Sequence, residues 1–217
     1  MSSSPSSTTP RSRRLGATAL ALGSFSLVLS LGSYVTAYGE PLWMVGFERA
    51  VVGHGAQAAW AVTQLCYPYV LGPLGVALLA IAWRFPEWRA RVVFSLILLL
   101  LCWRGADLLQ HLYARPRRLD WVIHHETSFS FPSSHAAISL GFYGLWSAFV
   151  AKSRLPGRAI LSALLAAVVV AIYWSRLALG AHYVTDLVAG GFLAVALVSA
   201  GVAAVPIKVF GSPTAAP

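Results

Sequence analysis

Residues 175–186 read SRLALGAHYVTD and place an arginine, a histidine and an aspartate between two apolar segments of the chain. An ionisable side chain at membrane depth costs about 3 kcal/mol, so it marks a functional site. We predict that a helix begins near Ala181, which would put His182 and Asp186 on one face. A carboxylate that orients an imidazole makes the histidine a better base or nucleophile. The stretch therefore predicts both a break between two membrane spans and a reactive histidine.

The composition assigns the chain to the membrane. Hydrophobic residues make up 58% of the 217 residues, charged residues make up 11%, and the mean hydropathy is +0.70. A soluble domain of this length cannot bury so much apolar surface. Runs close to the roughly 20 apolar residues that cross a bilayer occupy residues 15–39, 59–83, 92–113, 133–151, 159–175 and 184–207. We therefore predict an all-α integral membrane protein with six transmembrane helices.

Basic residues in the loops predict how these helices are oriented. Arginines and lysines cluster before the first apolar run, between the second and third, between the fourth and fifth, and after the sixth. All of these clusters fall on one side of such a topology, and the positive-inside rule assigns that side to the cytoplasm. The net charge of +9 then reflects topology rather than nucleic-acid binding, because the basic residues form no single patch. We predict a bacterial inner-membrane protein with its polar junction at 175–186 on the outer, periplasmic or extracellular, side.

The chain reads as one membrane domain between short tails. Residues 1–14 start with a Ser/Thr/Pro-rich stretch and are predicted to be a disordered tail. Residues 15–209 would form the membrane domain, and residues 210–217 a short C-terminal tail. The first apolar run is too long for the core of a signal peptide, so we predict a retained anchor. Cys66 and Cys102 lie inside predicted spans and offer neither a disulfide framework nor a metal-binding spacing.

The predicted topology brings three polar segments of the chain to the same face of the membrane. These segments are residues 110–118, 131–135 and 175–186, which together supply arginines, serines, histidines and a carboxylate. Guanidinium groups match the oxygens of an anionic tetrahedral group such as phosphate. The helix that starts after Pro132 would direct its free backbone N–H groups and the positive end of its dipole at the same anion. The three segments therefore predict a phosphate site.

The same segments resemble the signatures of the type 2 phosphatidic acid phosphatase (PAP2) superfamily. The sequence FPSSH at residues 131–135 resembles the second signature, usually Pro-Ser-Gly-His, and SRLALGAHYVTD matches the third, Ser-Arg-x5-His-x3-Asp. The first signature, Lys-x6-Arg-Pro, is matched in part, with Gln110 at the lysine, Arg117 at the arginine and Arg118 at the proline. The resemblance covers residues 107–190 and implies a PAP2/haloperoxidase-like helical bundle.

The resemblance also implies a mechanism and a set of site residues. His182 would attack phosphorus to form a phosphohistidine while Asp186 orients its ring, and His135 would protonate the leaving oxygen. The phosphate would be held by Arg117, Arg176, Ser133, Ser134 and Gln110. This scheme needs no metal ion and no other cofactor.

The implied function is that of a membrane-embedded lipid phosphatase acting on a phosphate or diphosphate monoester of a lipid. The family suggests undecaprenyl diphosphate, phosphatidate or phosphatidylglycerol phosphate as substrate, and membrane lipids are the other expected partners. The oligomeric state is left open. Three alternatives also stay open: a lipid phosphotransferase of the same family, a non-catalytic lipid transporter, and a haem protein with His135 and His182 as axial ligands.

The remaining polar residues of these segments receive structural interpretations. Arg104 and Asp107 are three residues apart and are predicted to form a buried pair within the third span. Glu126 lies with His124 and His125 in a stretch that we expect to be a solvated loop, with a role in shaping substrate entry as the alternative. Arg115 and Arg118 are expected to supply the positive charge of the missing lysine.

Overall fold

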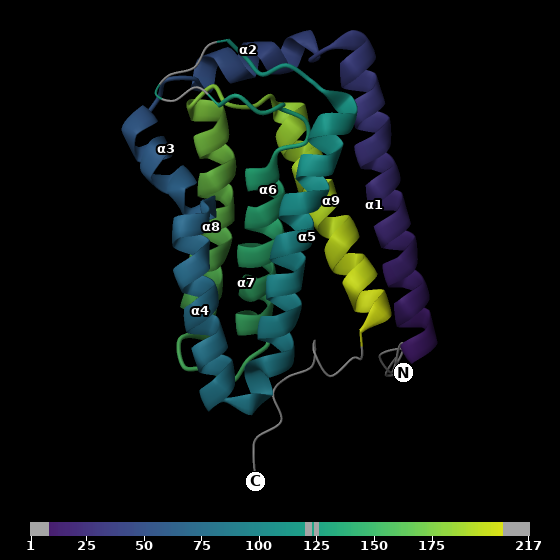
Figure 1. Ribbon diagram of the computed structural model, residues 1–217, viewed down its shortest axis with the longest axis vertical. Coiled ribbons are helices and arrows are strands. Elements are labelled where there is room, and N and C mark those ends of the chain that lie inside the picture. The colour runs from purple at the N-terminus through teal and green to yellow at the C-terminus, as the bar shows by residue number, and fades with distance from the viewer. Residues whose placement is uncertain (1–8, 120–122, 124–125, 206–217) are drawn as a thin grey trace, which may run out of the picture.

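The computed structural model describes residues 9–119, 123 and 126–205 of the chain. All regular elements in this described part are helical. In chain order they are α1 (Pro10–Tyr38), α2 (Leu42–Val51), α3 (Ala56–Thr63), η1 (Gln64–Cys66), α4 (Pro68–Arg84), η2 (Pro86–Trp88), α5 (Arg89–Tyr113), α6 (Ser134–Ile138), η3 (Ser139–Gly144), α7 (Leu145–Ala151), α8 (Arg158–Ala178) and α9 (Val184–Ala204). The long helices stand side by side, and α2 lies across one end of them (Figure 1).

Fewer membrane spans are found than the sequence predicts. Four described helices are long and apolar enough to cross a bilayer, namely α1, α5 with η2, α8 and α9. The α3–η1 segment and α4, bent by 46° at Tyr67, make a fifth if they form one span. The predicted span at residues 133–151 is not among them, because it is divided into α6, the π-helical η3 and α7. Serines and glycines in this segment suit contact with neighbouring helices better than contact with lipid.

The outer surface of the bundle is apolar, which identifies an integral membrane protein. Large side chains such as Leu108, Val170 and Ile160 are about two-thirds exposed. Exposing such a surface to water is unfavourable in free energy, whereas lipid tails solvate it. Within the membrane, each helix satisfies its own backbone hydrogen bonds, so helices are the natural spanning element for this sequence.

The predicted N-terminal tail, residues 1–14, overlaps the first helix of the structure. The first helix starts at Pro10, earlier than the predicted boundary at Leu15, because Thr9 caps it by accepting a hydrogen bond from the Ser12 backbone N–H at 3.2 Å. The predicted C-terminal tail at 210–217 lies outside the described residues.

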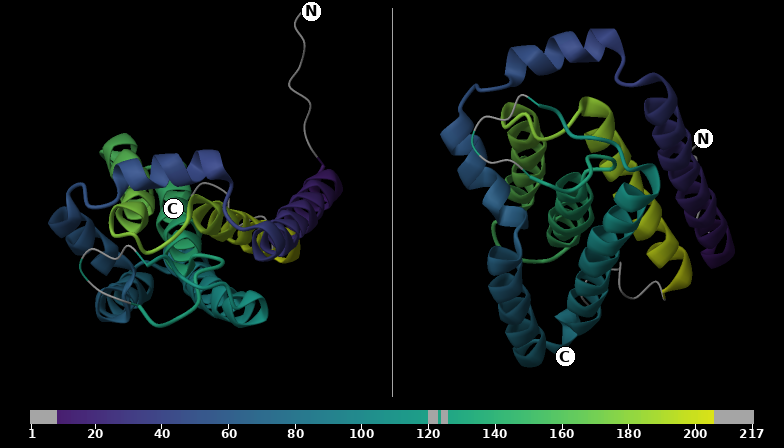
Figure 2. Two further views of the ribbon diagram at one scale, coloured as in Figure 1. Left: turned by 90° about the horizontal axis from the view of Figure 1, so that it is seen from above. Right: turned by 45° about the horizontal axis from the view of Figure 1, so that its top comes forward.

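Helix α2 was not predicted from the sequence. It lies across one end of the bundle, between α1 and α3 (Figure 2). We call this end of the bundle the α2 end. Its Leu42 and Trp43 side chains are exposed, whereas Glu48 is buried toward the bundle. An apolar outer face is typical of a helix that lies in the membrane interface. The described parts of the α5–α6 loop, residues 114–119 and 126–133, and the turn at 179–183 lie at this same α2 end (Figure 1).

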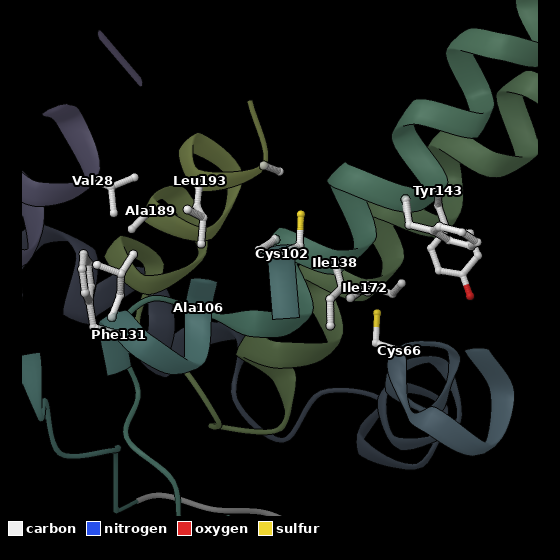
Figure 3. Packing of buried hydrophobic residues seen from close by; sticks show 14 of the residues in the cluster. Val28, Cys66, Cys102, Ala106, Phe131, Ile138, Tyr143, Ile172, Ala189 and Leu193 are labelled. Atoms are coloured by element: carbon white, nitrogen blue, oxygen red, sulfur yellow. The ribbon is translucent and has the colours of Figure 1, made fainter. Parts of the chain in front are cut away.

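The core joins the helices that carry the polar segments. Phe131, Ala189 and Leu193 pack in one buried cluster with residues of α1, α5 and α8 (Figure 3). Gly190 lets α9 approach α6 closely, since a Cβ atom there would collide with the carbonyl oxygen of Ser133. This contact fixes the start of α6 against the start of α9.

The predicted buried pair in the third span is wrong. Arg104 is exposed, with its guanidinium carbon 5.0 Å from the centre of the Trp103 ring. Asp107 instead lies 3.7 Å from Nδ1 of His111, one turn further along α5. Asp107 therefore pairs with His111, four residues later on α5, and not with Arg104, three residues earlier.

We expect labelling of single cysteines to show which end of the bundle faces outward. In a Cys66/Cys102-free background, Thr127→Cys at the α2 end should react with an impermeant thiol reagent on intact cells, and Lys152→Cys should react only after lysis. Both positions are exposed, whereas the neighbouring Ser153 is buried and would stay unlabelled in either orientation. The reverse pattern would place the α2 end in the cytoplasm.

Candidate active site

The loop between α8 and α9 carries the reactive histidine. Helix α8 ends at Ala178, and Gly180, two residues further on, has a φ of +66° that is readily adopted only by glycine. His182 lies in the loop, and Asp186 occupies the third position of α9. The expected helix start near Ala181 is therefore three residues early, since α9 begins at Val184. The pair still forms, with His182 Nδ1 3.3 Å from Asp186 Oδ2, because Asp186 turns back to accept the Tyr183 backbone N–H at 3.0 Å.

The surroundings of His182 determine which ring nitrogen is reactive. Nε2 of His182 lies 3.0 Å from Nη1 of Arg117. A guanidinium group donates hydrogen bonds and has no acceptor, so Arg117 favours the tautomer in which Nε2 presents its lone pair and Nδ1 carries the proton toward Asp186. Burial, followed by Arg117 and Arg176, lowers the pKa of His182 well below its usual range. The ring is therefore neutral at pH 7, with a nucleophilic lone pair directed at a cationic group.

Two arginines from different parts of the chain meet beside His182. Arg117 is anchored by Ser128, whose backbone carbonyl and hydroxyl oxygens accept hydrogen bonds at 2.7 and 2.8 Å. Arg176, in the last turn of α8, donates to Thr63 Oγ1 at 2.8 Å, and its side chain is only 1% exposed. Two rigidly held guanidinium groups in a buried site are suited to bind a tetrahedral anion.

A carboxylate already occupies the space between these arginines. The Glu126 oxygens lie 2.9 Å from Arg117 Nη2 and 2.5 Å from Arg176 Nη2. The same carboxylate interacts electrostatically with both His135 and His182. Burial alone would raise the pKa of Glu126, but the guanidinium groups of Arg176 and Arg117 hold it below the ordinary range. Glu126 is therefore a fixed negative charge where an anionic ligand would bind, and the expectation of a solvated side chain is wrong.

His135 faces the same site from α6. Its Nε2 is buried and has no hydrogen-bond partner among the described residues. The Tyr67 ring meets it edge-on, with ring centres 5.2 Å apart. A buried polar atom without a partner is rare in native proteins and requires a reason, such as a group that only a ligand supplies.

The other predicted phosphate ligands support the loop at residues 131–135. Ser133 caps α6, with its Oγ accepting from the Ala136 N–H at 3.3 Å, and donates its own N–H to the Asp186 carbonyl at 3.0 Å. Gln110 donates its side-chain amide to the Pro132 carbonyl at 2.9 Å. Ser134 is half-buried at the start of α6. The structure thus brings the three polar segments together, with Ser133 and Gln110 engaged in bonds within the protein.

The expectation that Arg115 and Arg118 replace the missing lysine is wrong. Arg115 Nη1 bonds Asp186 Oδ1 at 2.6 Å, and its Nη2 bonds Glu40 at 2.9 Å. Arg118 forms an ion pair with Glu48. These carboxylates neutralise both arginines, so the positive charge directed at the anion site comes from Arg117 and Arg176.

An apolar cavity of about 390 Å³ adjoins the site between α4 and α5. His135 and Ser134 line it on the side of the site, and the remaining lining includes Tyr67, Leu71, Leu99 and Trp103. A larger apolar cavity of about 500 Å³ lies toward the opposite end, around Trp88 and Trp146, and contains none of the site residues. The smaller cavity therefore combines an apolar space with direct access to an ionisable group.

Comparison with known proteins assigns the family. The sequence model of the PAP2 superfamily matches residues 91–209, which is more than half of the chain. The chain therefore belongs to the PAP2 superfamily. Among solved structures, it is similar to the first transmembrane PAP2-type phosphatidylglycerolphosphate phosphatase from Bacillus subtilis, with a TM-score of 0.67 and 22% identity over 83% of this chain and 94% of that one. A search of curated proteins finds no match.

Sequence reasoning missed three acidic residues of this region, namely Glu40, Glu48 and Glu126. None of them lies in a motif. The sequence feature that could have identified them is the small number of acidic residues, 7 in the whole chain. A carboxylate in so apolar a protein requires a charged or hydrogen-bonding partner.

We expect Glu126→Gln to strengthen the binding of an anion to the site. Removing the carboxylate frees the two arginines, and a charged hydrogen bond is worth about 1.5–3 kcal/mol, so vanadate should bind about tenfold more tightly. Calorimetry on the purified protein measures this, with Glu87→Gln at the opposite end as the matched control. Weaker vanadate binding in Glu126→Gln would show instead that the carboxylate is needed to hold the arginines in place.

Proposed function

We propose that this protein is a membrane lipid phosphatase that works through a phosphohistidine on His182. The observation that carries the proposal is the arrangement of the His182 ring, with Nδ1 on Asp186 and Nε2 facing Arg117. In such an arrangement Asp186 stabilises the positive charge that develops on the His182 ring during attack, and Arg117 holds the anion beside Nε2. Membership of the PAP2 superfamily supports the same chemistry.

The proposed reaction has two steps. In the first, His182 Nε2 forms a bond to phosphorus while the bond to the lipid oxygen breaks, and His135, which takes up a proton when the phosphate anion binds, donates that proton to the lipid oxygen. In the second, water attacks phosphorus and His135 accepts a proton from that water. Phosphate leaves as the bond between phosphorus and His182 Nε2 breaks. The buried, unpartnered Nε2 of His135 is the atom suited to these proton transfers. The mechanism uses no metal ion.

The substrate phosphate would take the place that Glu126 holds now. Arg117 and Arg176 already converge on an anion there, so phosphate oxygens would replace the carboxylate oxygens. The start of α6 at Ser133 and Ser134 would add its positive dipole end. Gln110 would act from behind, through its bond to the Pro132 carbonyl.

The apolar cavity between α4 and α5 supports a lipid as substrate. It extends from His135 toward Leu96, Leu99 and Leu100 on α5, so an acyl or prenyl chain would lie along the helices while its head group meets the arginines. Phosphatidate, phosphatidylglycerol phosphate and undecaprenyl diphosphate fit this requirement. The similar structure from Bacillus subtilis is that of a phosphatidylglycerolphosphate phosphatase, which makes this lipid the first to test. We further propose that the site faces the outer side of the membrane.

We expect His182→Ala to abolish turnover. Loss of the nucleophile should lower kcat at least about a thousandfold, or roughly 4 kcal/mol in transition-state stabilisation. Phosphate release from a panel of lipid phosphates, with and without a chelator, measures this. Asp186→Asn should retain the nucleophile and show a smaller loss. Near-normal turnover in His182→Ala, or strict dependence on added divalent metal, would refute the mechanism, and phosphoryl transfer to a second lipid would identify a transferase.

We expect Arg117→Ala to cost far more activity than Gln110→Ala. Arg117 contacts both His182 and the anion site, so its loss should lower kcat/KM at least about a hundredfold. Gln110 acts only through the loop, and its loss should cost about tenfold or less. The two variants should be compared on the same lipid phosphate at matched expression. A larger loss in Gln110→Ala would mean that the glutamine itself contacts substrate.

A further inference from the structure

Three carboxylates gather at the first turn of α9. Asp186 accepts the backbone N–H of Tyr183 at 3.0 Å, Glu48 that of Val184 at 2.7 Å, and Glu40 that of Thr185 at 3.2 Å. A helix N-terminus leaves such N–H groups unpaired and has a positive dipole end, so each carboxylate is stabilised there. Two of the three come from the segment of α2 and its preceding turn, which is distant in sequence.

Arg115 joins one of these carboxylates to the candidate catalytic pair. Its Nη1 lies 2.6 Å from Asp186 Oδ1 and 2.8 Å from Thr185 Oγ1, and its Nη2 lies 2.9 Å from Glu40 Oε2. The Tyr183 ring covers its guanidinium carbon at 3.9 Å. All these charged side chains are at most 6% exposed. A continuous chain of contacts therefore runs from Glu40 through Arg115 and Asp186 to His182.

The structure assigns to Arg115, held by Glu40, the role of a positioning residue for Asp186 in the proposed phosphatase reaction, on which this inference rests. Arg115 occupies Asp186 Oδ1, which leaves Oδ2 directed at Nδ1 of His182. Glu40 supports the other side of the guanidinium group through Nη2 and Thr185.

Glu40 has an electrostatic role in this chain of contacts as well as a steric one. When His182 becomes phosphorylated its ring gains positive charge, which Asp186 must balance. An Arg115 without Glu40 would place its full charge on Asp186 and weaken this balance. The other charged groups around His182 are Arg117, Arg176 and Glu126.

Glu40 lies outside residues 91–209, the part of the chain that matches the family. It follows Gly39, whose φ of +76° ends α1 and turns the chain inward. The interfacial helix α2 starts two residues after Glu40, at Leu42. The inference therefore gives the α1–α2 turn a part in the reaction that the family motifs do not contain.

The Glu48–Arg118 pair provides a matched control. Its side chains are as buried as those of Glu40 and Arg115, at 1% and 7% exposure, and Glu48 holds the neighbouring N–H of α9. Glu48 also hydrogen-bonds Glu40, and burial, followed by this neighbour, raises the pKa of Glu48 to about 7. A glutamine at position 48 preserves the size of the side chain and removes its negative charge, as a glutamine does at position 40. Glu48 bonds Arg118, the α9 backbone and Glu40, and it does not bond Asp186 or His182 directly.

The test compares Glu40→Gln with Glu48→Gln on dioctanoyl phosphatidate in detergent micelles. We expect Glu40→Gln to lower kcat about tenfold with KM within about twofold of wild type, because Arg115 positions the nucleophile and does not bind phosphate. Glu48→Gln should keep kcat within about threefold. Thermal unfolding of both variants separates this effect from a loss of folded protein, and where Glu40→Gln does not fold, Thr185→Val is measured in its place.

The outcomes separate this inference from the proposed function. Equal losses of kcat in the two glutamine variants would reduce the Glu40–Arg115 pair to a structural role and overturn the inference. A raised KM at unchanged kcat, or wild-type kinetics in Glu40→Gln, would overturn it as well while leaving the phosphatase proposal intact. Absence of turnover by the wild-type protein on every lipid phosphate would refute the proposed function itself.

Discussion

Pairing of buried charges organises the α2 end of this protein. Four carboxylates and four arginines meet there, and each of these carboxylates has an arginine partner. Removing one partner from a buried ion pair costs about 3–5 kcal/mol, so the groups must be placed together. This charge pairing joins Arg115 and Arg118 to the start of α9 and to the α1–α2 segment, beside the backbone bond from Ser133 to Asp186.

The pairing divides the arginines into two functional groups. Arg115 and Arg118 are neutralised by carboxylates from the α1–α2 segment and by Asp186, so they hold the α9 start in place. Arg117 and Arg176 share one carboxylate, Glu126, which lies on a loop. A single carboxylate bridges these two guanidinium groups beside His182, and under the proposed function a substrate phosphate would take its place.

Local patterns predicted the reactive residues better than they predicted the surrounding contacts. The spacing of His182 and Asp186 predicted their pairing, which forms although the histidine precedes α9, because the aspartate folds back over the helix start. The same kind of reasoning was wrong for Arg104 and Asp107, because spacing on a helix does not determine whether Asp107 pairs with Arg104 or with His111. The predicted six spans are not shown by the described helices, because apolar composition does not reveal the bend at Tyr67 or the π-helical turns within residues 133–151.

By itself, the sequence determined that the chain is an all-helical membrane protein with a phosphate-type motif set, because hydropathy and motif spacing are properties of neighbouring residues. Only the tertiary structure decided which arginines pair with Glu126 beside His182 and which charged groups contact Asp186. Glu40 is 75 residues from Arg115, and Glu48 is 70 residues from Arg118. Electrostatic pairing acts through space, and no periodicity along the chain encodes which charges meet when the helices pack.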